Sequence, residues 1–513
     1  MGLVLQLVET RTDGGTRSVE LMELGRPGNL HDIADLGLTL PEAKPLLVCV
    51  QQAVVAVQAR DHAMLRPDCA SCGERFRIKD WRSRRVATLF GEVVVRLPRF
   101  RCPGCGRGET GTNWPAHCRS TPELDQRQAH LSALMTYRVA AGVLAHLLPV
   151  AAGTSLGTLR RHTLKLGERL RNAATVEPDA ANAAAAPAIA LSLDATFIRS
   201  RHKGERHLEV RVGNAETPGG GRQLFGAVAN AGTDIVALIR RTLDTMGRTS
   251  DTEPTAFTDG CSCMRSILAE AGVTDPPILD WFHLSMRLQH AKQAAGGLPV
   301  DGPDRVQARA AIAAEVERLR WRTWNGKAKD ARITLERIHA LLPSFEGEPA
   351  RKLRRALDAV DRYLRSQSAH LVDYAERHRA GLRVGTSLTE STANFLVNRR
   401  RATSQQRRWS RRGADLLLQV RCAVYNGTLG TGFGQRFQAA NDPHPPAAIA
   451  ARPPISRQSL IPRSSSGSPP SVRWAVGGSC AGCRHADAAD ASAIQRLGLD
   501  RRIGRPRTCG KHR

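Results

Sequence analysis

The sequence predicts an α/β protein, and three observations indicate this class. Residues 188–200 (AIALSLDATFIRS) form an apolar run typical of a buried strand, and the run delivers one aspartate, Asp194. More strand-like runs follow, whereas residues 285–380 show helical patterning with few breakers. Two CxxC pairs precede both regions. We therefore expect a sheet domain with a helical insertion, preceded by a small metal-stabilised module.

Composition sets the broad class of the chain. Its 513 residues are enough for two to four domains, and 41% are hydrophobic, which is adequate for a buried core. Lys and Arg number 75 against 48 Asp and Glu, so the net charge of +27 favours polyanionic partners. The N-terminus lacks a secretory pattern, and no run of about 20 apolar residues predicts a membrane span. The 12 cysteines are thus expected to be metal ligands or free thiols of a reducing compartment.

The N-terminal region, residues 1–65, gives little functional information. Residues 1–45 are mixed and Gly-rich, with little periodicity. Residues 45–65 form an amphipathic pattern that predicts a helix used for packing or self-association.

Residues 66–120 are predicted to form a zinc ribbon. Two CxxC pairs can place four thiolates around one Zn²⁺, and residues 86–97 supply a hairpin between them. Free or redox-active thiols are the alternative, and His117 or Cys118 is a conceivable substitute ligand. Nearby arginines are expected either to contact phosphate or to form a solvated basic face. The four ligands are Cys69, Cys72, Cys102 and Cys105, and the arginines are Arg82, Arg84, Arg85, Arg96, Arg99 and Arg101.

Residues 121–185 are predicted to be a helical DNA-binding region followed by a linker. Residues 155–162 open a helix after an Ala-Gly turn, in the manner of the second half of a helix-turn-helix. A packed helical hairpin without DNA contact is the alternative. Residues 172–187 have linker composition, which puts a domain boundary near residue 185. The candidate DNA contacts are Thr158, Arg160, Arg161 and His162.

The core strands are expected within residues 186–284. After the strand with Asp194, two alternating segments predict antiparallel neighbours, a helix follows, and two more short strands lead to a helix beginning at His283. The segments, in order, are 206–213, 224–230, 235–246 (helix), 255–258 and 277–280.

Three acidic residues are the candidate metal ligands. Asp194 and Asp259 each end a strand-like run, and Glu390 lies in a helical pattern over 386–398. Mg²⁺ prefers oxygen ligands, and two such ions about 4 Å apart can clamp both oxygens of a phosphodiester displacement. Singly, each acid has a plainer explanation: a strand-end cap, a turn or a solvated helix residue.

Asp280 and His283 lie between the second and third acids. Their spacing of three places them on one helical face, where they can orient a ligand. Asp280 is also an alternative to Asp259 as the second catalytic acid. We favour Asp259, because its strand–Asp–Gly context is similar to that of the second aspartate in the family that the chain resembles, described below.

The segment 381–435 carries the last acid and a dense cationic run. Asn394, Asn398 and Arg401 continue the helical face of Glu390. We expect the cationic run to contact the DNA backbone. The basic residues are Arg399, Arg400, Arg401, Arg407, Arg408, Arg411 and Arg412. Residues 436–513 have a disorder-like composition rich in Pro, Ser, Ala and Arg, and a frameshifted or readthrough end would explain them.

These motifs together resemble a known family. Asp194, Asp259 and Glu390, with Asp280–His283 (DWFH) between them, resemble the DDE transposases of bacterial insertion sequences. The ISKra group is nearest, and Mutator-like transposases are more distant. The segments ILDWFHLSMRLQH, TESTANFLVNRRR and QQRRWSRRG carry the likeness, which spans roughly residues 60–430.

The resemblance implies a ribonuclease-H-like catalytic core with helices inserted before the last acid. It also implies two Mg²⁺ or Mn²⁺ ions per active site, binding to terminal inverted repeats, cleavage and strand transfer. The partners would be double-stranded element and target DNA and further copies of the chain, in the cytoplasm at the nucleoid. Two alternatives stay open: a non-catalytic, zinc-dependent DNA-binding protein derived from such an enzyme, and a structure-selective nuclease.

Overall fold

The computed structural model describes residues 2–10, 14–25, 32–33, 36–112, 114, 119–150, 155–173, 185–385, 394–398 and 408–430. All of them belong to one compact unit, Met1–Asn441. The predicted tail, most of the predicted linker and Glu390 lie outside the described residues.

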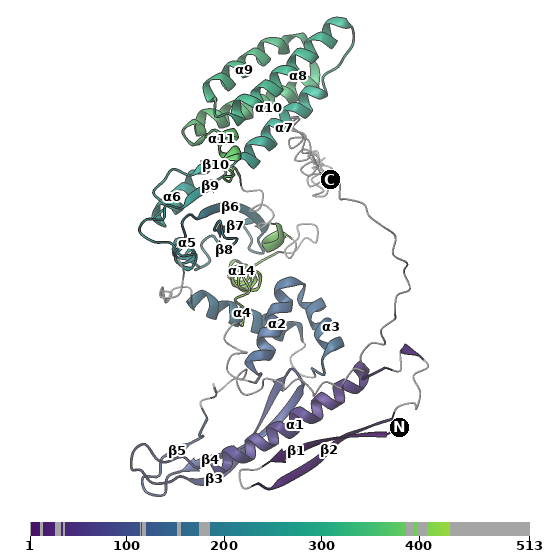
Figure 1. Ribbon diagram of the computed structural model, residues 1–513, viewed down its shortest axis with the longest axis vertical. Coiled ribbons are helices and arrows are strands. Elements are labelled where there is room, and N and C mark those ends of the chain that lie inside the picture. Colours follow the sequence, from purple (N-terminus) through teal and green to yellow (C-terminus); the bar gives the residue numbers. More distant parts are fainter. Residues whose placement is uncertain are drawn as a thin grey trace, which may run out of the picture. The chain divides into compact units, whose positions relative to one another are not determined.

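The centre of the described chain is a five-stranded mixed sheet, in the order β10-β9-β6-β7-β8 (Figure 1). Strands β6, β7 and β8 form an antiparallel meander, and β9 and β10 run parallel to β6 on its other side. The prediction of a mixed α/β fold is therefore confirmed. The strands are β6 (Ala190–Arg199), β7 (His207–Glu216), β8 (Arg222–Val228), β9 (Thr255–Thr258) and β10 (Ile278–Leu279).

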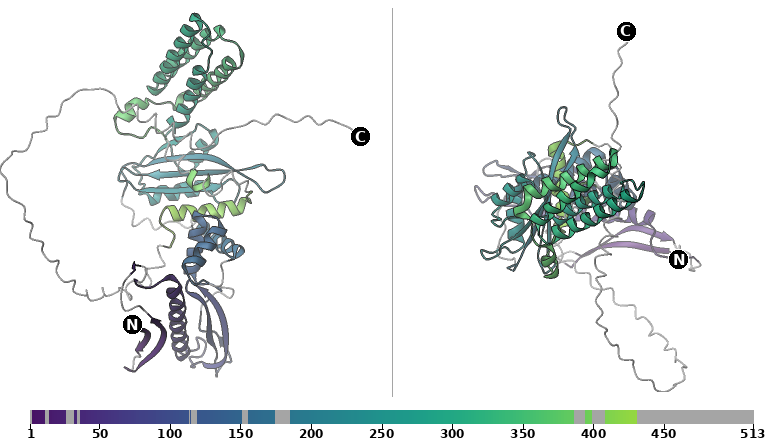
Figure 2. Two further views of the ribbon diagram at one scale, coloured as in Figure 1. Left: turned by 90° about the vertical axis from the view of Figure 1, so that its right-hand side faces the viewer. Right: turned by 90° about the horizontal axis from the view of Figure 1, so that it is seen from above.

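The two faces of this sheet are covered by different elements, as the left view of Figure 2 shows for α14. Alternate residues of a strand point to opposite faces. On β6, Leu191 and Leu193 pack in one core with α5 (Ile235–Thr245) and α6 (Ser262–Glu270). Ile198 packs on the opposite face with α14 (Arg411–Tyr425) and the short π-helical turn Asn394–Asn398. Asp194 has the same parity as Ile198, so it belongs to the α14 face.

A helical segment with its own apolar core follows the sheet, as predicted. It runs through α7 (Trp281–Gly296), α8 (Pro303–Trp324), α9 (Ala328–Leu341), α10 (Gly347–Gln367) and α11 (Tyr374–Arg379). Its core includes Leu319, Leu335 and Leu353, and it also takes in Leu279 of β10. This segment therefore packs directly against the strand end that precedes Asp280.

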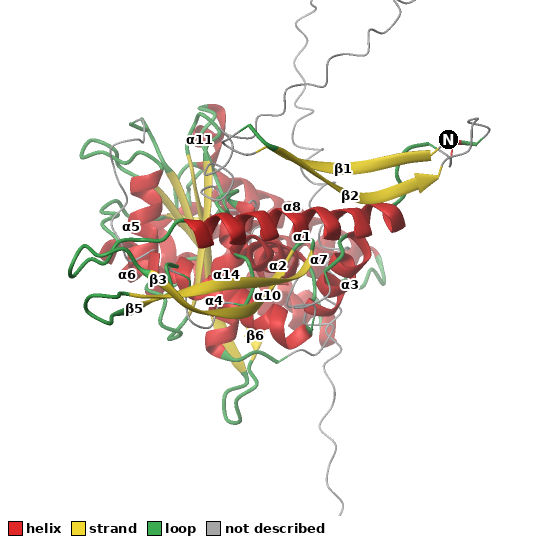
Figure 3. Cartoon of the chain, turned by 90° about the horizontal axis from the view of Figure 1, so that it is seen from below, coloured by secondary structure: helices red, strands yellow, loops and turns green. Residues whose placement is uncertain are grey.

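The N-terminal region contains a hairpin that was not predicted from the sequence. Strands β1 (Gly2–Thr10) and β2 (Thr16–Gly25) pair antiparallel, and the alternation in LVLQLVE was the available signal (Figure 3). Helix α1 (Leu40–Met64) begins earlier than predicted because Thr39 and Glu42 form a capping box. It is the one described helix long and apolar enough to cross a membrane, by length and composition only, and it packs along β4.

The next modules connect the N-terminal region to the sheet. Strands β3 (Arg77–Thr88) and β4 (Gly91–Arg101) form the predicted hairpin, longer than expected, and β5 (Gly108–Glu109) joins β4. Helices α2 (Pro122–Leu134), α3 (Tyr137–Leu147) and α4 (Leu156–Ala173) follow. Helix α4 approaches α14 closely at Gly167, where a Cβ would lie 2.3 Å from the Leu416 carbonyl oxygen.

Candidate metal sites: four cysteines and a carboxylate cluster

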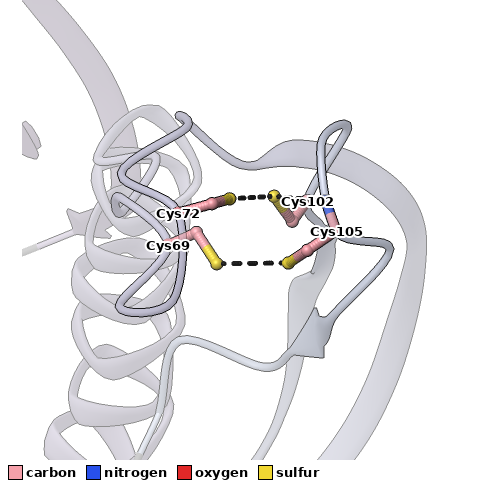
Figure 4. Close-up of side chains that lie close together, drawn as sticks. All are labelled: Cys69, Cys72, Cys102 and Cys105. Carbon is pink, nitrogen blue, oxygen red and sulfur yellow. Dashed lines mark hydrogen bonds between the residues drawn. The ribbon is translucent and has the colours of Figure 1, made fainter.

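The four predicted zinc ligands converge in the structure. The thiols of Cys69, Cys72, Cys102 and Cys105 all lie within 4.8 Å of one another. Figure 4 shows Cys69 facing Cys105 and Cys72 facing Cys102, with Sγ–Sγ distances of 3.6 and 3.3 Å. Zn–S bonds of about 2.3 Å in a tetrahedron require similar separations. The residues present thus fit a Cys₄ zinc site.

Each half of this site is formed by its own turn, and the two turns have the same backbone hydrogen bond. The N–H of Gly73 donates to the Cys69 carbonyl over 2.8 Å, and the N–H of Gly106 donates to the Cys102 carbonyl over 3.1 Å. Each glycine has a φ of +74°, which is unfavourable for other residues. The extended pattern CxxCG, present twice, was a sequence signal for these loops that the CxxC spacing alone did not use.

The pKa values of two neighbouring thiols, Cys69 and Cys72, shift in opposite directions. Hydrogen bonds, the Ser71 N–H first, lower the pKa of Cys69 to about 6. The pKa of Cys72 is raised to about 12, because the thiol of Cys102 and burial outweigh the Glu74 N–H. Four neighbouring thiolates repel one another, so a bound divalent cation is what would hold all four ionised.

The carboxylate site follows from the strand register. Ser192 pairs with Phe257, and Thr258 pairs with Leu279, in parallel ladders. Continuing these registers places Asp194, Asp259 and Asp280 at one level on three adjacent strands, which are spaced about 4.8 Å apart. The Asp280 N–H donates to the Thr258 carbonyl over 2.9 Å, which extends the pairing to the strand ends.

Asp194 is a partly buried carboxylate among like charges. Burial raises its pKa, His283 opposes the shift, and Asp259 and Asp280 add to it. Its Oδ1 accepts a hydrogen bond from the Ala195 N–H over 2.7 Å. A bound divalent cation would favour the ionised carboxylate and so lower the pKa of Asp194 again.

Asp259 is held through its backbone and side chain by different elements. Its Oδ1 accepts from the Cys261 N–H over 2.9 Å, and its carbonyl accepts from the Tyr363 hydroxyl over 2.7 Å. Gly260, with a φ of +89°, makes the turn that follows. Tyr363 comes from α10, so the helical segment fixes this strand end. No local sequence signal identified that tyrosine.

Asp280 is fully buried and has a structural task. It is the N-cap of α7, and its Oδ1 accepts from the Phe282 N–H over 2.9 Å. Its Oδ2 lies 3.6 Å from His283 Nε2. Because Asp259 is more accessible than Asp280, the geometry is compatible with the predicted preference for Asp259, whose catalytic role stays a prediction.

The described residues on either side of Glu390, up to Gly385 and from Asn394, are held by contacts with the fold. Before it, a Cβ on Gly385 would lie 2.6 Å from Asp280 Oδ1, and the Val384 carbonyl accepts from the Trp281 N–H over 3.3 Å. After it, the buried Arg421 donates from Nε to the Leu396 carbonyl over 2.6 Å. Leu396 belongs to the core on the face of Asp194. The flanks therefore start beside Asp280 and end on the α14 face.

The predicted DNA contacts differ in accessibility. Arg160, Arg161 and Arg408 are exposed, whereas Thr158 is partly buried. His162 faces α2, with Nδ1 at 2.7 Å from Gln128 Oε1 and 2.8 Å from Asp125 Oδ1. Arg411 pairs with Glu205. His162 and Arg411 thus have internal partners. The side chains of Asn394 and Asn398, together with Arg399, Arg400, Arg401 and Arg407, lie outside the described residues.

Among the described residues, only the four cysteines form a group of three or more side chains close enough to share one metal ion. The aspartates are neighbours without reaching that proximity. The structure thus has two candidate sites: acids at one end of a five-stranded mixed sheet, and a separate four-thiol cluster in the β3–β4 module.

Comparisons with known proteins give distant matches to solved structures only. No family model and no curated protein matches the chain. The structure is similar to the Drosophila P element transposase strand transfer complex, with 11% sequence identity and a TM-score of 0.31. The match covers 62% of this chain and 94% of that one. A TM-score this low supports no conclusion about function.

Proposed function

We propose that the chain is a DDE-type transposase of a bacterial insertion sequence, of the ISKra group, that binds terminal inverted repeats and catalyses DNA cleavage and strand transfer. One observation carries the proposal: the register aligns Asp194 and Asp259 at one end of the sheet, with Asp280 beside them. The mixed sheet, with three antiparallel strands and two parallel ones, is compatible with the ribonuclease-H-like core that the resemblance implies.

The proposed roles follow from the position of each side chain. Asp194 and Asp259 would hold Mg²⁺ or Mn²⁺ together with Glu390, whose flanking residues are anchored near Asp280 and on the α14 face. Two such ions would activate the attacking water, or the 3′-hydroxyl of the cleaved DNA, and would stabilise the leaving oxygen. Asp280 would position α7 and His283 beside the carboxylates through its N-cap hydrogen bond.

DNA binding would use the basic surface of the preceding modules. Arg160 and Arg161 on α4 are exposed, and the β3–β4 hairpin carries further arginines. With the net charge of +27, these residues favour phosphate contact. The structural zinc would hold this hairpin in shape. Assembly of several copies on element ends, at the nucleoid in the cytoplasm, belongs to the same proposal.

The test is incubation of the full chain with DNA from both flanks of its gene and Mg²⁺ or Mn²⁺, with nicks and joined products mapped to the nucleotide. We expect nicks at fixed element ends and joined target products. Asp251→Asn is the matched control for the variants Asp194→Asn and Asp259→Asn. It should nick normally, because Asp251 is an exposed turn residue of the same domain.

Two results would reject the proposal. Binding to ends without metal-dependent nicking would favour the non-catalytic DNA-binding protein. Nicking without preference for the ends would favour a structure-selective nuclease.

A further inference from the structure

A pair of exposed thiols lies next to the carboxylate site. Cys261 and Cys263 flank Ser262 at the start of α6, and their Sγ atoms are 3.1 Å apart. A disulfide bond has an S–S distance of about 2.05 Å, so closing the bond needs an approach of only about 1 Å. The position of Cys261 and Cys263 directly after Asp259 predicts small buried thiols, with a metal role as the alternative. The prediction of burial is wrong, since both residues are exposed.

The exposure of this pair calls for a chemical explanation. Free cysteine is among the most buried residue types, because the thiol is apolar and is oxidised when accessible. Cys261 and Cys263 are also separate from the Cys₄ site, and no third ligand joins them in the part of the chain that the structure describes. Two thiols in near contact at the surface suit thiol–disulfide exchange better than packing or metal binding.

The pair is coupled to Asp259 through a short, constrained segment. The Cys261 N–H donates to Asp259 Oδ1 over 2.9 Å. Gly260 packs closely against α10, since a Cβ there would lie 2.8 Å from the Gln367 side chain. The Gly260 carbonyl also accepts from Arg265 Nη1 over 2.7 Å. A shift of the Cys261 backbone is therefore taken up at the Asp259 hydrogen bond.

We propose that Cys261 and Cys263 form a reversible disulfide modification site that lowers the affinity of the neighbouring carboxylates for a divalent cation. The oxidant is a small disulfide such as oxidised glutathione. One cysteine sulfur attacks it and releases one glutathione thiol, and the second sulfur attacks the mixed disulfide and releases the other. The protein loses two electrons and two protons, and the glutathione disulfide is reduced to two thiols.

The effect on the metal follows from the constraint on residues 261–263. Closing the ring displaces the Cys261 N–H, so Asp259 Oδ1 loses a donor that orients it. Loss of one hydrogen bond corresponds to roughly a three- to tenfold change in affinity. The role of Asp259 as a metal ligand rests on the proposed function, whereas disulfide formation does not.

The experiment uses the full, zinc-loaded chain, reduced or treated with oxidised glutathione. Alkylation and tryptic mass mapping follow the peptide 249–265, which contains both cysteines. We expect two alkyl groups in the reduced peptide, and none, with two hydrogens lost, after oxidation. Electron paramagnetic resonance of free Mn²⁺ then measures metal binding, which we expect to weaken roughly three- to tenfold on oxidation and recover with dithiothreitol.

Matched variants separate this site from other thiols. The double variant Cys261→Ser/Cys263→Ser should keep the Mn²⁺ affinity of the reduced protein and lose the response to glutathione. Cys422→Ser, which changes a buried thiol elsewhere, should keep that response. A chromophoric chelator monitors zinc release, so that oxidation of the Cys₄ site is recognised.

Three outcomes would overturn the inference. They are a peptide 249–265 that stays fully alkylated while zinc is still bound, a disulfide that leaves Mn²⁺ affinity unchanged, and a double variant that still responds. If Mn²⁺ binds in neither state, the carboxylate site and its coupling both fail, while the mass map still decides whether the disulfide forms.

Discussion

The two candidate metal sites differ in how they are assembled. The cysteine site takes all its ligands from two similar turns, each closed by its own glycine and joined by one hairpin. The carboxylate site takes Asp194 and Asp259 from strands more than sixty residues apart in the sequence, and the proposal adds Glu390 from beyond the helical segment. Short-range signals therefore define the first site almost completely, whereas the second depends on sheet register.

This difference also separates their energetics. Four thiols around zinc contribute folding free energy to a small hairpin module. The carboxylates instead oppose folding without a metal, since burial and mutual repulsion raise the pKa of Asp194. On the proposed roles, the first site would stabilise the protein when zinc is bound, whereas the second keeps a repulsion between carboxylates that a bound cation would relieve.

The largest expected effect is at the cysteine site. Cys102→Ser should abolish stoichiometric zinc and unfold the β3–β4 module. Apparent zinc-binding free energies of about 10–16 kcal/mol in small zinc modules match or exceed the stability of a typical domain. Metal analysis should give about one zinc per wild-type chain, and circular dichroism should follow the unfolding.

Cys49→Ser is the control for this prediction, because Cys49 is a partly buried thiol on α1 outside the cluster. It should keep the full zinc content. A Cys102→Ser chain that retained both zinc and an intact module would show that the four thiols are not a metal site.

The next largest effect is at the carboxylates. Asp194→Asn, Asp259→Asn and Glu390→Gln should each lower end cleavage by at least roughly 10²-fold, comparable to the loss of one preorganised electrostatic group. DNA affinity should stay equal or rise, since a negative charge near a polyanion is removed. Gel-based cleavage and binding assays on the same DNA measure both quantities.

Asp280→Asn distinguishes the two assignments of the second acid. Asp280 caps α7, so its replacement should impair folding more than chemistry. If Asp259→Asn still cleaved while Asp280→Asn bound ends normally but was inert, Asp280 would be the second acid.

The sequence predicted the parts of the fold that have local periodicity. Strand β9 lies where it was expected, at Thr255–Thr258, and the helical segment follows it. The β1–β2 hairpin was not predicted, because its alternation of apolar and polar residues occurs in a region of mixed composition. Contacts between distant segments could not be predicted: Tyr363 reaches Asp259 from 104 residues away, and no local pattern records such a pairing.

A smaller effect tests the packing of Gly385 against Asp280. Gly385→Ala would place a methyl group 2.6 Å from Asp280 Oδ1. We expect the free energy of unfolding to fall by about 1–3 kcal/mol, as for overpacking elsewhere, with reduced cleavage. Gly296→Ala, at a helical glycine whose Cβ would meet nothing within 4 Å, should instead stabilise by up to about 1 kcal/mol. Chemical denaturation of both variants measures the contrast. Equal effects would mean that Gly385 is not packed against Asp280.

The smallest effect is the pH dependence of the repulsion at Asp194. The pKa of Asp194 is raised in the folded protein, so between its ordinary value and that raised value the folded state binds more protons than the unfolded state. Stability without metal therefore falls as pH rises through this window, and the loss is complete above the raised pKa. Asp194→Asn removes the charge but keeps an oxygen for the Ala195 N–H. In chelator at neutral pH this variant should have a higher unfolding temperature than the wild type, and the difference should vanish as pH falls toward 4. Added Mn²⁺ should reverse the order, because only the wild type gains a full ligand set. A variant that is less stable than the wild type at neutral pH in chelator would show that Asp194 is paired in the fold rather than repelled.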